Sequence, residues 1–153
     1  MKRLSLKIPP PLVALLCAVA IWGLSEIFPP HGIGVEIRRS IACILLGMAI
    51  SIDLWALVSF KLAKTTIDPR YPHKTSAIVS SGIYRYTRNP MYLGLILTLS
   101  ALSIWLGAKF GLFVVGGFIM YINTFQIIPE EEHLEKKFGD VYIRYKTKVR
   151  RWI

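Results

Sequence analysis

The sequence predicts an all-α membrane protein with about four transmembrane helices and a C-terminal amphipathic cytoplasmic helix. Hydrophobic residues make up 54% of the 153 residues, and the mean hydropathy is positive, at +0.49. A soluble domain of this size has too much surface for its volume to bury so much apolar material. The apolar residues also form long blocks instead of alternating. We therefore expect a single membrane-embedded domain over residues 1–153.

Four apolar blocks are the expected membrane spans. Each has 17 to 20 residues, close to the ~20 needed to cross a hydrocarbon core of ~30 Å. Backbone amides in lipid must be paired within their own segment, so the blocks should be helices. The expected helices are about 11–28, 41–60, 91–107 and 110–128, with a cytoplasmic loop over 61–90 and a cytoplasmic tail over 129–153. No small-residue cleavage site follows the first block, so we expect it to be retained and not removed as a signal peptide.

The basic residues predict the orientation. Sixteen of the 19 Lys and Arg residues lie in the N-terminal segment, the loop 61–90 and the tail 129–153. Four crossings put these three segments on one side, which the positive-inside rule makes cytoplasmic. The expected location is the inner (plasma) membrane, with multiple passes and both termini in the cytoplasm.

The net charge of +10 is explained by this arrangement, because anionic lipid headgroups attract such segments. The expected partners are membrane lipids and not nucleic acid, since no nucleic-acid-binding motif accompanies the charge. Cys17 and Cys43 lie in or beside apolar blocks without metal-ligand spacing, and His31, His73 and His133 are scattered. They indicate neither a metal site nor a disulfide framework.

Tyrosines, arginines and an amide gather where the third block begins. Residues 82–94 read G-I-Y-R-Y-T-R-N-P-M-Y-L-G. Asn89-Pro90 alone is explained by helix capping. The whole string suits an anionic or aromatic ligand held by donors, a helix N-terminus and rings. The length of the segment Lys61–Ser81 also permits a lid over such a site.

The tail combines a helical pattern with an acidic start. Apolar and aromatic residues recur at steps of three or four, on one face of a helix; they are Leu134, Phe138, Tyr142, Tyr145 and Val149. This pattern alone predicts an amphipathic helix lying on the bilayer. Glu130-Glu131-Glu132 directly follows the fourth block, where capping of a helix N-terminus is one explanation and a binding site is another.

Two acidic residues lie in or near the apolar blocks. Asp53 is inside the second block, where an ionisable group is a functional candidate by default. It can instead face the bundle interior or water. Glu26 lies near an interface and is expected to reach the headgroups.

Two segments resemble the motifs of the isoprenylcysteine carboxyl methyltransferase and phospholipid methyltransferase superfamily. The first motif usually reads G-x-Y-x-x-x-R-H/N-P-x-Y-x-G, and here it is formed by Gly82, Tyr84, Arg88, Asn89, Pro90, Tyr92 and Gly94. The second, E-E-x-x-L-x-x-x-F-G-x-x-Y-x-x-Y-x-x-x-V, runs from Glu130-Glu131 to Val149. The resemblance covers roughly Ser81–Trp152, about half of the chain.

The resemblance implies an S-adenosylmethionine-dependent methyltransferase that releases S-adenosylhomocysteine. The seven residues of the first motif would form the cofactor pocket on the cytoplasmic side, and Glu130 or Glu131 would accept hydrogen bonds from the cofactor's amino group. Because the donor already carries a positive leaving group, positioning matters more than acid–base chemistry. No catalytic residue is assigned, and the positioning candidates are Asn89, Tyr92 and Gln126.

Two positions depart from the family pattern and leave the substrate open. Asn89 stands where the family often has His, so a general base there is not available. Gln126 stands where many carboxyl-methylating members have an Arg suited to gripping a carboxylate. The leading hypothesis is methyl transfer to a small lipophilic substrate, similar to the isoprenylcysteine enzymes. The alternatives are a phospholipid amine N-methyltransferase and a non-catalytic membrane scaffold that has kept the fold.

Overall fold

The computed structural model describes residues 6, 8–30, 32–63 and 78–153, and the regular elements in these ranges are all helical. This confirms the all-α prediction. The helices are α1 (Pro10–Ile27), α2 (Val35–Ala63), η2 (Gly82–Arg85), α3 (Pro90–Leu106), α4 (Gly111–Ile122), η3 (Asn123–Ile127), α5 (Ile128–Phe138) and α6 (Asp140–Lys148). Lys2, Arg3, Lys7 and His31 lie outside the described residues, as do residues 64–77, which make up most of the suggested lid.

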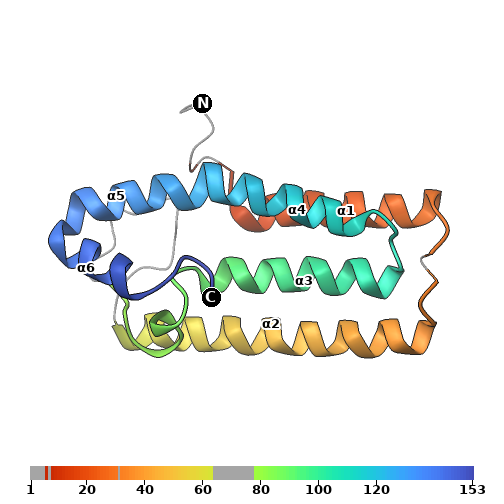
Figure 1. Cartoon of the computed structure of the whole chain (residues 1–153), viewed down its shortest axis with the longest axis horizontal. Helices are drawn as coiled ribbons and strands as arrows, with labels where there is room; N and C mark the ends of the chain where they lie inside the picture. The colour runs from red at the N-terminus through yellow and green to blue at the C-terminus, as the bar shows by residue number, and fades with distance from the viewer. Residues whose placement is uncertain (1–5, 7, 31, 64–77) are drawn as a thin grey trace.

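The long helices run side by side, with α3 between α2 on one side and α1 and α4 on the other (Figure 1). Helix α2 packs along α3. Its buried face carries three alanines seven residues apart, Ala42, Ala49 and Ala56. Such small side chains let two helix backbones approach closely, which is how helices associate in lipid. On the other side of α3, the core is built from large apolar residues such as Ile21 and Phe118.

Three helical stretches are long and apolar enough to cross a membrane. They are α1, residues Val35–Leu62 of α2, and the continuous helix Gly111–Phe138. The apolar helix α3 has 17 residues. Large apolar side chains such as Leu16, Ile44 and Phe113 are mostly exposed on the outer faces of these helices. Apolar surface of this extent fits a lipid environment, and the protein is a membrane protein.

A short π-helix, η3, joins α4 to α5 within this continuous helix, and a proline explains the local hydrogen bonding. Pro129 has no amide proton, so the carbonyl of Phe125 lacks its normal helical partner. The backbone amide of Leu6 donates to that carbonyl at 3.1 Å. Leu6 is thereby attached to the π-helix. Such π-segments often occur at functional sites.

The tail forms two helices and not the single amphipathic helix expected from its periodicity. Gly139 has a φ of +52°, which ends α5 and starts α6 in a new direction. The residues that share the predicted face still turn inward, since Tyr142 and Val149 are buried. After α6 the chain returns toward the start of α3 (Figure 1), and Trp152 packs on the main core.

Candidate active site

The site begins with the tight turn that precedes α3. Gly82 has a φ of +59°, and a Cβ there would collide with Ser59 of α2, so glycine is required. The turn buries Tyr84, whose backbone carbonyl accepts a hydrogen bond from the Tyr145 hydroxyl at 2.8 Å. Burial, followed by the nearby Tyr145, Asp53 and Glu130, raises the pKa of the Tyr84 phenol. The Tyr84 ring also packs against Phe60 of α2, with the ring centroids 5.3 Å apart, so the turn contacts both α2 and α6.

Tyr92 and Glu130 link the two motifs directly. Pro90 occupies the first turn of α3 as expected, and Tyr92 lies half a turn further along. The buried Tyr92 donates its hydroxyl proton to Oε1 of Glu130 at 2.7 Å. A residue from each sequence motif thus meets at the end of the bundle where α3 begins.

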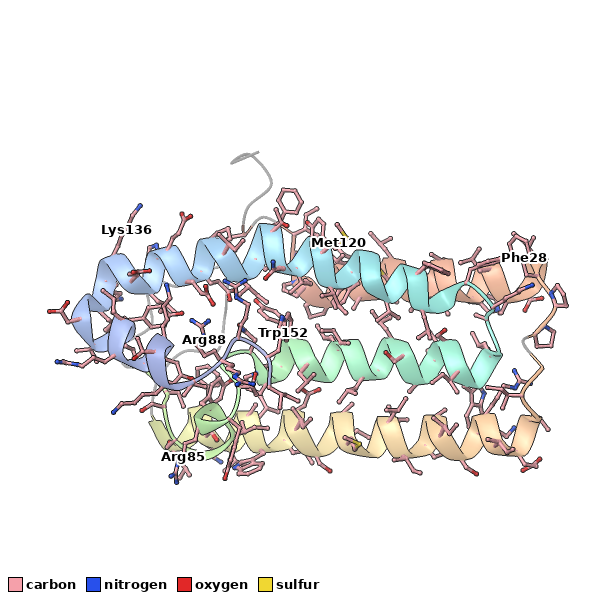
Figure 2. The ribbon with its side chains drawn as sticks, in the orientation of Figure 1. Phe28, Arg85, Arg88, Met120, Lys136 and Trp152 are labelled. Carbon is pink, nitrogen blue, oxygen red and sulfur yellow. The ribbon has the colours of Figure 1, made fainter. Side chains whose placement is uncertain are left out.

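Glu131 is held by two guanidinium groups. Arg88 Nη1 lies 3.2 Å from Glu131 Oε1. Arg151 grips the same carboxylate with two nitrogens, Nε to Oε1 at 3.1 Å and Nη2 to Oε2 at 2.7 Å, while its Nη1 donates to Asn123 Oδ1 at 2.7 Å. In Figure 2, Arg88 lies beside the start of α3, and Trp152 lies between the start of α3 and the continuous helix that contains α4 and α5. Glu131 therefore connects the C-terminal segment, through Arg151, to the first motif, through Arg88.

Asn89 has a different role from the cap that the sequence predicted. It occupies the N-cap position of α3 but makes no side-chain cap hydrogen bond. Its amide Nδ2 donates to the backbone carbonyl of Arg151 at 2.9 Å, and the Thr87 hydroxyl donates to the same oxygen at 3.2 Å. The backbone amide of Arg88 also donates to the Arg150 carbonyl at 3.0 Å. We call residues 149–153, fixed in this way, the C-terminal latch.

Capping does not account for the acidic cluster. The backbone is helical from Asn123 through α5, with helical dihedrals at Ile127 and Ile128. Glu130 and Glu131 consequently lie inside a continuous helix and have no free helix N-terminus to cap. The binding-site interpretation remains.

The two carboxylates differ in electrostatic environment. Glu130 lies beyond the apolar part of its helix, and it is hydrogen-bonded to an uncharged phenol. Burial, with a smaller contribution from Glu131, raises the pKa of Glu130 to about 8, against the opposing hydrogen bond from Tyr92. Glu131 has two cations beside it. Glu130 is therefore the carboxylate that gains most from a positively charged ligand.

The donor set fits the charged groups of S-adenosylmethionine. Arg88 Nε is buried without a hydrogen-bond partner among the described residues. A buried guanidinium nitrogen that is left unpaired suits an incoming carboxylate. Glu131 pairs with this arginine, and Glu130 is the residue before it. The Glu130 carboxylate suits an amino group. The amino-acid part of the cofactor carries both.

Two other predicted residues lie apart from this cluster. Gln126 is fully buried in η3, and its Nε2 donates to the backbone carbonyl of Ile8 at 2.8 Å. Gly94 faces α2, where a Cβ would collide with the carboxylate of Asp53. Gly94 thus permits the close helix approach that the resemblance implies, and it brings Asp53 to the edge of the site.

The sequence interpretation missed Arg151 and Asn123. Arg151 falls just after the second motif, in a basic run that indicated contact with lipid headgroups. Asn123 lies inside the fourth apolar block, where a buried polar side chain is a weak signal for a partner. Burial, followed by the nearby Glu131, raises the pKa of Tyr142 to about 12, and Arg88 opposes this increase.

Comparison with known proteins decides the family. The sequence profile of the phospholipid methyltransferase family matches residues 37–141, which is more than half of the chain. The chain belongs to this family. The match begins in α2 and ends in α6, so it contains the first motif, the second motif from Glu130 to Gly139, and the Tyr92–Glu130 contact. It supports membrane methyltransferase activity in general.

A shorter relative comes from Haemophilus influenzae. It is 56% identical over 63 residues, which are 41% of this chain and all of the relative, and its own function is uncharacterised. No solved structure matches the chain significantly. The phospholipid methyltransferase family match thus gives the reaction class, and the choice of cofactor and substrate rests on the geometry of the site.

Proposed function

We propose that the protein transfers a methyl group from S-adenosylmethionine to a small lipophilic substrate at the cytoplasmic face of the inner membrane. The observation that carries this proposal is the Tyr92–Glu130 hydrogen bond, which joins the two motifs at one end of the bundle. Both termini are cytoplasmic in this proposal, because the basic segments then share one face. Membrane lipids surround the helices, and the substrate arrives from the bilayer.

The chain's own residues would bind and orient the cofactor. Glu130 would accept hydrogen bonds from the cofactor's amino group, and Tyr92 fixes the orientation of Glu130. Arg88, whose Nε has no hydrogen-bond partner among the described residues, would pair with the cofactor's carboxylate. Asn89 and Glu131 position these residues through the C-terminal latch. When bound, S-adenosylmethionine supplies an activated methyl group on a positive sulfur, so exclusion of water and alignment are the main requirements.

The isoprenylcysteine-like and phospholipid-amine substrates would need different side chains at position 126. A carboxylate substrate needs a cation, whereas Gln126 is an amide already bonded to Ile8. An amine substrate needs no such cation. This observation favours an amine-bearing lipid over a prenylated cysteine carboxylate, and the family match is in line with it.

The test is methyl transfer in isolated membranes. Membranes containing the protein are incubated with S-adenosylmethionine labelled in the methyl group, and the lipid extract is analysed by mass spectrometry. We expect a labelled lipid product with the wild type and with Glu132→Gln, an exposed neighbour. At a limiting cofactor concentration we expect labelling with Glu130→Gln to be about 10- to 150-fold slower. Labelled product at wild-type rates from Glu130→Gln would refute the assigned site. No product from a folded wild type would favour the non-catalytic scaffold.

A further inference from the structure

The end of the bundle opposite the candidate active site carries basic residues of its own. Helix α3 begins beside the candidate active site and runs to Leu106, where the turn to α4 follows (Figure 1). Arg38 and Arg39 of α2, with Lys109 of this turn, are the three basic residues outside the segments that the charge pattern places in the cytoplasm. The positive-inside rule makes basic residues scarce on the far side of the membrane, so the arginines at this end need a physical explanation.

The Arg38 side chain is held between two connections of the chain. Gly107 ends α3 with a φ of +67°, and a Cβ there would collide with Nη1 of Arg38. The same Cβ would lie 2.9 Å from the Cβ of Pro30, in the segment between α1 and α2. The Arg38 guanidinium therefore lies against bare backbone at the end of α3, beside the α1–α2 connection.

The end of α3 explains the position of Arg38 but does not satisfy its donors. The negative end of a helix dipole favours a cation. The Ser103 and Ile104 carbonyls, however, already accept hydrogen bonds from backbone amides of the turn that follows, at 2.9 and 3.1 Å. Nε of Arg38 is buried and has no hydrogen-bond partner among the described residues. A buried guanidinium nitrogen of this kind is suited to an acceptor from outside the chain.

Arg39 brings a second guanidinium to the end of α3. Its Cζ lies 5.6 Å from the centroid of the Trp105 ring, which belongs to the last turn of that helix. Arg39 also pairs with Glu36 at 3.8 Å, but both side chains are largely exposed. An exposed ion pair of this length contributes little. Arg39 is therefore available to an anion that Arg38 binds.

Apolar side chains beside the two arginines are exposed. Ile37 and Ile41 of α2 flank the arginines in sequence, and both are exposed, as is Trp105. Tryptophan at the end of a membrane helix typically lies at the level of the lipid headgroups. Cations at this level, next to exposed apolar surface, fit a ligand with an anionic head and an apolar chain.

We propose that Arg38 and Arg39 bind the phosphate group of an acidic phospholipid at the end of the bundle opposite the candidate active site. The planar donor fork of a guanidinium matches the oxygens of a phosphate. A choline headgroup carries a cation of its own, which the two arginines repel, so the site prefers a headgroup with net negative charge. This site is separate from the proposed methyl transfer, because it assigns no substrate and lies at the other end of α3 from Tyr92 and Glu130.

The test is native mass spectrometry of the full chain in detergent, which measures the affinity for the first bound dioleoyl phosphatidylglycerol or dioleoyl phosphatidylcholine. We expect the wild type to bind phosphatidylglycerol about tenfold or more tightly than phosphatidylcholine, the value of one charge-assisted hydrogen bond. Arg38→Gln should weaken phosphatidylglycerol binding by about the same factor. Lys136→Gln is the matched control, since it removes the same charge from an exposed position at the other end of the molecule (Figure 2) and should keep the wild-type affinity.

Arg39→Gln is the second variant, and it decides the test if Arg38→Gln does not fold, because Arg39 is exposed. We expect it to weaken phosphatidylglycerol binding while circular dichroism shows a wild-type helix content. Wild-type affinity in the folded arginine variants, or an equal loss in Lys136→Gln, overturns the proposal. Inorganic phosphate is added at the lipid's concentration as a competitor. It should leave the bound lipid in place, and displacement by inorganic phosphate would show a free-anion site and overturn the lipid assignment.

Discussion

Replacing Arg151 by Ala removes the centre of the C-terminal latch. Three hydrogen bonds are lost, two to the Glu131 carboxylate and one to Asn123. Each hydrogen bond to a charged group contributes about 1.5–3 kcal/mol, but such contributions within one network are not additive. The Arg151 side chain is 31% exposed, and Arg88 still pairs with Glu131. We therefore expect a loss of about 2–3 kcal/mol, below the 3–5 kcal/mol of a fully buried pair.

The assay is thermal unfolding in detergent micelles, followed by circular dichroism at a fixed scan rate. At about 2–4 °C per kcal/mol for a chain of this size, the midpoint should fall by about 4–12 °C. Arg151→Lys should fall between the wild type and the alanine variant, because an ammonium cannot form the two-pronged contact. Arg150→Ala is the control, since it removes the same charge from an exposed neighbour. Equal midpoints for Arg151→Ala and Arg150→Ala would refute the latch.

Three further predictions follow from local geometry. Gly94→Ala places a methyl group on the Asp53 carboxylate and should lower stability by about 1–3 kcal/mol in the same assay, whereas Gly117→Ala, which meets open space, should not. Tyr145→Phe loses the hydrogen bond to the η2 carbonyl and should lower stability by about 1 kcal/mol. The raised pKa of Glu130 means that ligand-free stability falls as the pH rises from 4.5 to about 8, because the unfolded chain ionises first. The midpoint of Glu130→Gln should therefore exceed that of the wild type at pH 8 and match it at pH 4.

Apolar patterning predicted the helical class because lipid imposes helices on any long apolar block. The two motifs also predicted which residues to examine, and Tyr92 and Glu130 do meet. The break at Gly139 was not predictable from periodicity, because the inward face continues across it. The latch was missed for a similar reason. The partners of Arg151 come from parts of the chain far from it in sequence, and they are near it only because the tail returns to the start of α3. The sequence around Arg151 therefore does not predict its role.

The roles of Asn89 and the acidic cluster also depended on tertiary structure. An Asn before Pro at a helix start is normally a cap, and only the returning backbone of Arg151 offers Asn89 a different partner. Three glutamates after an apolar block resemble the first turn of a new helix. The π-helix before them makes the helix continuous, and this leaves no N-terminus to cap. A local pattern could not distinguish these cases.

The most direct test of the central claim is calorimetric titration of the purified protein with S-adenosylmethionine and S-adenosylhomocysteine. We predict saturable binding that Glu130→Gln weakens by about 10- to 150-fold, corresponding to the loss of one charge-assisted hydrogen bond of about 1.5–3 kcal/mol. Glu132→Gln, which removes an exposed charge two residues away, should bind like the wild type. Wild-type affinity in the Glu130→Gln protein, or no binding to a folded wild type, would contradict the account.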